Sequence, residues 1–154
     1  SVDIGCVRFT ERTLRSDPPA EDEISAGRGL AADVLTESLD AVDVSKAKTW
    51  IGVAGTVTTL SAVAQELPAY DAERTHLSTL TPADLDRTAR TLLHTDHETR
   101  AANPVIHPGR VDVIGGGALI VQVLAEQLAK RGGPTDLVVS EHDILDGIAL
   151  SLAD

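Results

Sequence analysis

The 154-residue chain has no methionine, one cysteine, and one residue each of tryptophan, tyrosine and phenylalanine. A native polypeptide starts with methionine, so its absence indicates an internal piece of a longer protein. The single cysteine, Cys6, excludes an internal disulfide and a zinc site built from several cysteines, as expected in a reducing cytoplasm. The three aromatic residues (Phe9, Trp50 and Tyr70) are too few to form a stacking platform for single-stranded bases.

Long apolar runs and positive charge are also scarce. The longest apolar stretches, within residues 118–125, are interrupted well short of the roughly 20 positions that a membrane-spanning helix requires, and no secretory signal opens the chain. Lysine and arginine number 13 against 24 aspartate and glutamate residues, which gives a formal net charge of −11. We therefore expect a cytoplasmic domain that binds neither nucleic acid nor a membrane surface.

The first third of the chain predicts a strand and a long helix. Residues 1–9 alternate in polarity and are rich in valine and isoleucine, which predicts a strand, and a short helical turn to Leu14 follows. Acidic residues at 21–23 begin a segment whose apolar residues recur at helical spacing as far as Val42. This segment is predicted to be an amphipathic helix.

The middle of the chain predicts one strand and three helices. Residues 48–54 suit a buried strand and lead into a helix over 56–67. Thr81, followed by proline at the first helical position and an acidic residue at the third, marks the start of a helix that extends to about Leu93. A short helix is expected within 94–103.

The end of the chain predicts a last strand and a last helix. Residues 136–139 suit a buried strand, and Ser140 with Asp143 three residues later has the spacing of a helix N-cap and its N3 residue. Because strands alternate with helices along the chain, the predicted fold class is α/β.

Residues 107–130 allow two interpretations. The stretch VDVIGGG could be a strand that leads into a glycine-rich phosphate-binding loop. Alternatively, 111–129 could be one continuous helix whose glycines at 115–117 let a neighbouring helix pack closely. Propensity favours the strand and loop, since each glycine costs a helix about 1 kcal/mol.

The segment TWIGVAGTVTTLSAVAQEL, at 49–67, joins a predicted strand to a predicted helix through a turn of small residues. Gly52 and Gly55 permit close approach of the backbone, and Thr56 begins a run that places hydroxyl and free amide N–H groups at the first helical turn. Such a turn favours an anion such as phosphate. It also fits an ordinary strand-to-helix turn capped by threonine, since it matches neither a Walker loop nor the dinucleotide-binding fingerprint.

Four stretches, in this order along the chain, together resemble the exopolyphosphatase/guanosine pentaphosphate phosphohydrolase family: SVDIGCVRFTER at 1–12, GVAGTVTTL at 52–60, HPGRVDVIGGGALIV at 107–121 and SEHDILDGIAL at 140–150. The chain resembles the C-terminal half of the family's short actinobacterial form. The resemblance implies the ribonuclease-H-like fold of actin, sugar kinases and chaperone ATPases. Residues 1–154 would form most of the second lobe, incomplete at its N-terminal strands. The resemblance also implies a hinge-side helix at 107–121, against the propensity argument.

The resemblance assigns the substrate-binding residues. It places Gly52, Gly55 and Thr56 in the cleft between the lobes, where a phosphate chain or a nucleotide would bind. It also places an arginine, Arg110, close to the phosphates, a role that suits the bidentate guanidinium group.

Two arginines have alternative roles. Arg110 could instead form an ion pair with a surface acid such as Asp112. Arg8, on the predicted first strand, could face the cleft as a further phosphate ligand or pair with Glu11.

The family's hydrolysis depends on a catalytic glutamate in the first lobe and on a glycine-rich phosphate loop at the start of the second, and neither is in this chain. Asp3-Ile4-Gly5 resembles the start of that loop, but Cys6 and Val7 follow where further glycines belong. We therefore predict no catalytic residue and no metal ligand among these residues. The family's cofactor, Mg²⁺, would be held mostly by residues outside the chain.

The missing strands have a structural consequence. The predicted strand at 1–9 would be left with an unpaired edge, and such edges seek partners. We therefore expect the chain to form a homo-oligomer or to associate with the missing lobe.

By this resemblance the chain is part of a magnesium-dependent exopolyphosphatase that releases terminal phosphate from inorganic polyphosphate, with guanosine pentaphosphate as a second candidate substrate. The chain alone is expected to be inactive. The alternative is a regulatory module that binds polyphosphate or guanosine tetraphosphate without hydrolysis. A third interpretation is a nucleotide-dependent kinase on the same fold.

Overall fold

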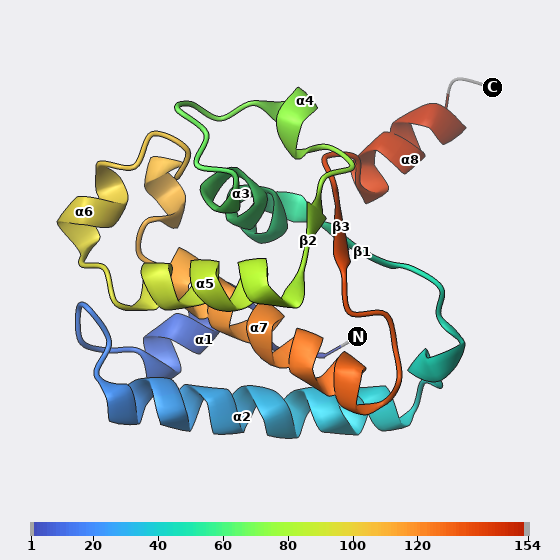
Figure 1. Cartoon of the computed structure of the whole chain (residues 1–154), viewed down its shortest axis with the longest axis horizontal. Coiled ribbons are helices and arrows are strands. Elements are labelled where there is room, and N and C mark those ends of the chain that lie inside the picture. Colours follow the sequence, from blue (N-terminus) through green and yellow to red (C-terminus); the bar gives the residue numbers. More distant parts are fainter. Residues whose placement is uncertain (1, 153–154) are drawn as a thin grey trace.

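The computed structural model describes residues 2–152 and has the predicted α/β class (Figure 1). Its helices are α1 (Cys6–Thr13), α2 (Glu21–Asp40), α3 (Ala54–Ala64), α4 (Ala72–Thr75), α5 (Pro82–Leu93), α6 (His97–Ala101), α7 (Ile114–Lys130) and α8 (Ile144–Ser151), with short 3₁₀ helices η1 (Val44–Lys46) and η2 (Pro108–Arg110). The strands are β1 (Trp50–Val53), β2 (Thr79–Leu80) and β3 (Leu137–Ser140). None of the helices in the described range is long and apolar enough to cross a membrane.

The sheet has three strands in the order β1-β3-β2. β1 runs parallel to β3, with Trp50 opposite Leu137 and Val53 opposite Ser140, and β2 is antiparallel to β3. The carboxyl ends of β1 and β3 therefore lie side by side. Within the described residues, β1 pairs on one side only, so its other edge is free.

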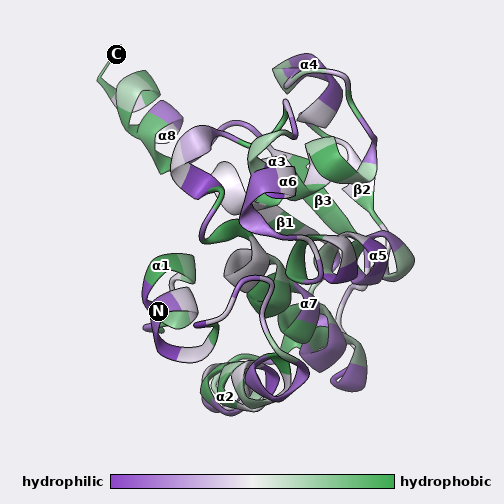
Figure 2. Cartoon of the chain, turned by 90° about the vertical axis from the view of Figure 1, so that its left-hand side faces the viewer, coloured by the Kyte–Doolittle hydropathy of each residue, from purple (hydrophilic) through white to green (hydrophobic). Residues whose placement is uncertain are grey.

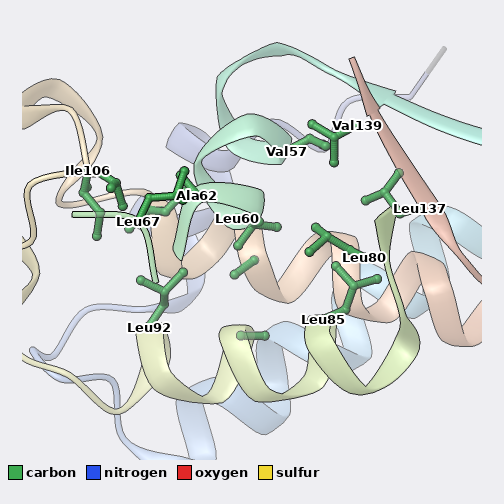
Figure 3. Packing of buried hydrophobic residues seen from close by; sticks show 14 of the residues in the cluster. Val57, Leu60, Ala62, Leu67, Leu80, Leu85, Leu92, Ile106, Leu137 and Val139 are labelled. Carbon is green, nitrogen blue, oxygen red and sulfur yellow. The ribbon is translucent and has the colours of Figure 1, made fainter. Parts of the chain in front are cut away.

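Helix α7 is the central helix of the molecule. It packs against α1, α2, α3 and α5, and Figure 1 shows it crossing between α2 and α5. Its buried Ile114 and Ala118 belong to a core formed with α3, α5 and the sheet, where Figure 3 shows Leu60, Leu85 and Leu137 gathered. On its other side, α7 contributes to a second core with α1 and α2. The helix therefore joins two cores.

The predicted starts of two helices are confirmed. The N–H of Asp84 donates to the Thr81 hydroxyl (3.2 Å) and the N–H of Thr81 donates to the Asp84 carboxylate (3.1 Å), which is the capping box expected at α5. At α2, the Glu23 carboxylate accepts hydrogen bonds from the N–H of Ala20 (3.0 Å) and from the Ser16 hydroxyl. These bonds hold the preceding loop against the first turn.

The glycine-rich segment before residue 118 is helical. A Cβ on Gly116 would overlap the hydroxyl of Thr10 on α1, and a Cβ on Gly117 would lie 2.7 Å from the methyl group of Thr56 on α3. The glycines therefore allow two helices to approach α7 closely. The helix that the resemblance implies at 107–121 is confirmed from Ile114 onward, whereas 108–110 form η2. The strand and loop favoured by propensity are wrong, because packing outweighs the propensity cost of glycine.

The strand predicted at 1–9 is wrong. Residue 1 lies outside the described residues, and Cys6–Thr13 form α1, which buries Phe9 in the core shared with α2 and α7. In the described structure no strand lies beside this segment, so alternation alone did not make it a strand. The unpaired edge expected there is consequently also wrong, and the free edge belongs to β1.

Several boundaries also differ from the sequence predictions. Helix α3 begins at Ala54, two residues earlier than predicted. The N-cap of α8 is Asp143, whose carboxylate accepts a hydrogen bond from the N–H of Leu145 (2.8 Å), rather than Ser140, which ends β3. Strand β2 and helix α4 were not predicted, because each is too short to show periodicity.

Adding a methyl group at Gly116 tests the close packing of α1 on α7. We expect Gly116→Ala to lower the free energy of unfolding by about 1–3 kcal/mol through overpacking against Thr10. Gly115→Ala is the matched control, because its Cβ would lie at an ordinary 3.6 Å from the nearest atoms, and it should stabilise the helix by up to about 1 kcal/mol. Urea denaturation measures both values, and equal stability of the two variants would contradict the packing.

The loop before α2 predicts a pH dependence of stability. Hydrogen bonds from the Ser16 hydroxyl and the Ala20 N–H lower the pKa of Glu23 from 4.5 to about 2. The ionised carboxylate therefore stabilises the fold above pH 4.5, and this contribution is lost as the pH falls toward 2.

Glu23→Gln should remove this component, so its thermal midpoint should fall less than that of the wild type between pH 4.5 and 2. Glu37→Gln, on the exposed side of the same helix, serves as the control and should follow the wild-type profile. Parallel profiles for wild type and Glu23→Gln would argue against the bonded carboxylate.

Candidate functional site

A groove of about 480 Å³ lies at the carboxyl ends of β1 and β3. Residues from four separate parts of the chain line it: Ala54, Gly55, Thr58, Tyr70, Pro104, Val105, Ile106, His107, Pro108, Arg110 and Glu141. In open α/β sheets ligands bind at this end of the strands. The groove is therefore the candidate site.

The guanidinium group of Arg110 lies directly on the first turn of α3. A Cβ on Gly55 would overlap it, so the arginine occupies this position because residue 55 has no side chain. Arg110 is half-buried, and its guanidinium forms no hydrogen bond or ion pair with any residue that the structure describes. The alternative ion pair with Asp112 is not formed, since the Asp112 carboxylate pairs with Nδ1 of His97 at 2.8 Å. An unpaired guanidinium beside a groove is available for an anionic ligand.

The start of α3 adds further donors for an anion. The N–H groups of a first helical turn have no partner within the helix, and no described side chain caps α3. The partial positive charge of the helix N-terminus also lies here. The guanidinium of Arg110 and the amides near Gly55 therefore face the groove together, which gives it a positively polarised end.

The backbone at the start of α3 is strained. Ala54, which lines the groove, has a φ of +69°. This value lies in the left-handed region, which residues other than glycine rarely adopt. Such a conformation costs on the order of 1–3 kcal/mol and persists only where the surrounding structure holds it. Strained backbone of this kind is frequent at ligand-binding sites.

The wall formed by Tyr70 and Glu141 combines an aromatic ring with a carboxylate. The Tyr70 hydroxyl donates a hydrogen bond to the Glu141 carboxylate (2.7 Å), which also accepts one from the Thr75 hydroxyl. Burial, together with the bond to Glu141 and its negative charge, raises the pKa of Tyr70. Tyr70 therefore remains a neutral hydrogen-bond donor that orients the carboxylate.

The segment between α6 and α7 completes the groove. Val105 and Ile106 are buried in the core beneath it. Nδ1 of His107 accepts a hydrogen bond from the N–H of Gly109 (3.1 Å), which fixes the turn before Arg110. The arginine is therefore attached to a segment anchored in the core.

Gly55 and Arg110 line the groove, whereas the other three residues predicted to bind substrate do not. Gly52 faces the core, where a Cβ would lie 2.8 Å from a methyl group of Leu137. The Thr56 side chain contacts α7 at Gly117. Arg8 lies on α1, exposed and paired with Asp3 at 2.8 Å, not with Glu11.

The sequence interpretation missed Tyr70 and Glu141. Glu141 directly follows β3, and the ends of neighbouring parallel strands share one edge of the sheet, so pairing β3 with β1 would have placed it near Gly55. Tyr70 lies in a loop, and no pattern in the sequence indicates its contact with a residue 71 positions away.

The side chains that could bind a metal ion are scattered in the part of the chain that the structure describes. Among the described residues there is no group of three or more histidine, cysteine, aspartate or glutamate side chains that could hold a metal ion. Among the described residues, Glu141 is the acidic side chain that lines the groove. Its carboxylate accepts hydrogen bonds from two hydroxyl groups. A magnesium ion here would need ligands from outside these residues.

Comparison with known proteins identifies relatives of the whole chain. A model of the Ppx/GppA phosphatase family matches residues 1–152. Exopolyphosphatase 2 of Mycobacterium tuberculosis is 54% identical over 153 residues, which cover 99% of this chain and 48% of that protein. A bifunctional 3-dehydroquinate synthase/phosphatase of Fusobacterium nucleatum is 30% identical over 152 residues, covering 97% of this chain and 22% of that protein.

Solved structures share the fold. The crystal structure of an exopolyphosphatase-like protein superposes with a TM-score of 0.93 at 35% identity, covering 98% of this chain and 49% of the other. The type II variant of the Aquifex aeolicus Ppx/GppA phosphatase gives a TM-score of 0.81 at 27% identity, covering 96% of this chain and 47% of the other. The chain thus spans about half the length of Exopolyphosphatase 2 and of these solved chains.

Proposed function

The chain belongs to the Ppx/GppA phosphatase family, and we propose that it is most of the second lobe of an exopolyphosphatase, which releases terminal phosphate from inorganic polyphosphate. The relative named Exopolyphosphatase 2, which matches nearly the whole chain, supports this activity. The solved Ppx/GppA phosphatases support a two-lobed protein with the actin-like fold, since this chain covers about half of each. The first lobe and the phosphate loop would then lie in the other half.

The unpaired guanidinium of Arg110 against the uncapped start of α3 is the observation that carries this proposal. Polyphosphate presents a row of anionic oxygens, and guanidinium and helix N-terminal N–H groups are the donors that bind such oxygens best. The chain has a formal net charge of −11, so attraction of a polyanion must be local. The groove provides that local attraction because no described acid neutralises Arg110.

This chain's part in the reaction is binding and charge stabilisation. In the proposed reaction water attacks the terminal phosphorus, the anhydride P–O bond breaks, and the shortened polyphosphate leaves. Arg110 and the amides near Gly55 would hold phosphate oxygens and share the charge that develops on them. The residue that activates the water would come from the first lobe, so the chain alone should be inactive.

Magnesium is the cofactor that the family resemblance implies. Bound near the phosphates, it would neutralise their charge. The described residues hold no cluster of ligands that fits a magnesium site, so its ligands would come mostly from the other lobe. The role proposed for Arg110 does not depend on the ion.

Substituting the groove arginine tests the proposal directly. We expect Arg110→Gln to weaken binding of inorganic tripolyphosphate to the 154-residue chain by about 10- to 100-fold, because a charge-assisted hydrogen bond is lost. Gly55→Ala should weaken it similarly, since its methyl group would displace the guanidinium. Isothermal titration calorimetry at fixed salt measures both, because phosphate affinity depends on ionic strength.

Arg87→Gln is the matched control, because Arg87 is exposed on α5 and already paired with Asp84 at 2.9 Å. It should bind tripolyphosphate like the wild type. If all three variants bind alike, the groove does not hold the phosphate chain.

Guanosine pentaphosphate is a second candidate substrate, favoured by the groove wall at Tyr70 and Glu141. The ring of Tyr70, which is 41% exposed, offers a surface for a purine base. Both hydroxyl groups donate to Oε1 of Glu141, so its Oε2 can accept a hydrogen bond from the N1–H or the amino group of guanine. A phosphorylated guanosine could therefore place its phosphates at Arg110 and its base at this wall.

Tyr70→Ala separates the two substrates. If the base lies on this wall, the variant should lose about 10-fold in affinity for guanosine pentaphosphate, a change of about 1.4 kcal/mol that matches the contact energy of an aromatic pair. Its affinity for inorganic tripolyphosphate should not change. A competition assay on the chain measures both, and equal losses for the two ligands would rule out recognition of the base.

The remaining alternative is a module that binds polyphosphate or guanosine tetraphosphate without hydrolysis. Phosphate release by the longer protein separates it from an enzyme. Release from polyphosphate, lost in Arg110→Gln, supports the phosphatase, and tight binding without release supports the regulatory module.

A further inference from the structure

Arg100, on the short helix α6, carries a buried charge that lies outside the groove. Its side chain is 7% exposed, and arginine is almost never buried to this extent unless its charge is paired. Each nitrogen of its guanidinium group donates a hydrogen bond: Nε to the Val111 carbonyl (3.0 Å), one terminal nitrogen to the Thr95 carbonyl and the other to the Asp17 carboxylate (2.7 Å). Arg100 therefore joins three segments of the chain at one point.

The three segments come from different parts of the fold. Asp17 lies in the loop between α1 and α2, Thr95 lies between α5 and α6, and Val111 lies between η2 and α7. Figure 2 faces this side of the molecule and shows α6 as a mostly hydrophilic helix (purple) above α1 and α2. One guanidinium group thus fixes two loops and the segment before α7 relative to one another.

The Asp17 carboxylate that balances this charge is itself held in place. One of its oxygens accepts the bond from Arg100, and the other accepts a bond from the N–H of His97 (2.6 Å) at the start of α6. Burial alone would raise the pKa of Asp17, but these two bonds outweigh burial and lower it. The carboxylate therefore stays ionised at neutral pH and compensates the buried guanidinium.

The bond to Val111 matters for the groove because Val111 directly follows Arg110. On one side, the N–H of Arg110 donates to the His107 carbonyl (2.8 Å). On the other side, Arg100 holds the Val111 carbonyl. The backbone that carries the Arg110 side chain is therefore fixed from both directions, although the Arg110 guanidinium forms no hydrogen bond or ion pair with the described residues. Binding costs less when a flexible side chain is ordered before the ligand arrives.

We infer that Arg100 is a positioning residue for Arg110: through the Val111 carbonyl it holds η2 so that the Arg110 guanidinium lies on the first turn of α3. Asp17 belongs to the same device, because it pairs with the charge of Arg100. Neither Arg100 nor Asp17 lines the groove, so both act through Arg110 and not on the ligand. The inference rests on the proposed binding of phosphate by Arg110.

A double-mutant cycle with Arg110 tests the inference. We expect Arg100→Lys to weaken binding of inorganic tripolyphosphate by about 5- to 10-fold in calorimetry on the chain, because one ammonium group cannot replace a guanidinium that donates in three fixed directions. In the Arg110→Gln background the same substitution should weaken binding by less than about 2-fold, since the residue that it positions is already gone.

Asp17→Asn is a milder second variant. The Asp17 side chain is 41% exposed, and asparagine keeps an oxygen that can accept the bond from Arg100. The variant should therefore lose less affinity than Arg100→Lys, and its loss should also vanish in the Arg110→Gln background. Removal of either partner of a buried pair would risk unfolding, so both substitutions are conservative and binding is measured well below the unfolding midpoint of each variant.

Nuclear magnetic resonance reads the position of Arg110 without a ligand. In the ¹⁵N-labelled wild type the Nε–H of Arg110 should be ordered on the picosecond to nanosecond timescale, as its heteronuclear Overhauser effect reports. In Arg100→Lys this effect should fall toward that of exposed arginine side chains. A role of Arg100 in stability alone would leave the signal unchanged.

Arg131→Lys is the matched control. Arg131 is another partly buried arginine paired with an aspartate, Asp40 (3.0 Å), but it lies at the opposite end of α7 from Arg110. Its substitution should lower the unfolding midpoint and leave both the tripolyphosphate affinity and the Arg110 signal at their wild-type values.

Two results would overturn the inference. The first is an Arg110 Nε signal that is as ordered in Arg100→Lys as in the wild type. The second is a loss of affinity from Arg100→Lys that is equal in the wild-type and Arg110→Gln backgrounds. If Arg110→Gln binds tripolyphosphate as tightly as the wild type, the proposed function fails instead, and the Arg110 signal still decides whether Arg100 positions this side chain.

Discussion

The structure depends on the absence of side chains where α3 and α7 meet. Gly117 lets Thr56 of α3 contact α7, and Gly116 lets Thr10 of α1 contact it. Gly55 leaves room for the guanidinium of Arg110. Because Arg110 lies four residues before α7, the close packing of these two helices places it on the first turn of α3. Packing and the proposed anion binding thus depend on the same close approach of the backbones, which comes at a cost in helix propensity.

The groove offers a way in which a strongly acidic chain could bind a polyanion, as proposed. Most acidic side chains on its surface either cap helices or pair with basic residues, as Asp84 does with Thr81 and Arg87. Arg110 has no such partner among the described residues, and Glu141 is engaged by hydroxyl groups. The proposed binding therefore depends on the local field of one guanidinium and a helix terminus, not on net charge.

How much the sequence could predict depended on whether the signal was local. The capping pattern at Thr81 and the glycine turn at Gly55 are local signals, and both correctly indicated the start of a helix. The alternation at 1–9 was misleading, because a strand requires a neighbouring strand, and the segment instead buries Phe9 as a helix. Tyr70 was missed because its contact with Glu141 spans 71 residues. The resemblance to the family, by contrast, carried long-range information and brought Gly55 and Arg110 to one site.

The central claim is that Arg110 and the start of α3 together bind a phosphate chain. Nuclear magnetic resonance of the ¹⁵N-labelled chain, titrated with inorganic tripolyphosphate, tests it most directly. The account predicts saturable shifts of the Gly55 amide and the Arg110 Nε resonance with one common dissociation constant. Saturable shifts confined to other residues, with these two resonances unmoved, would contradict it.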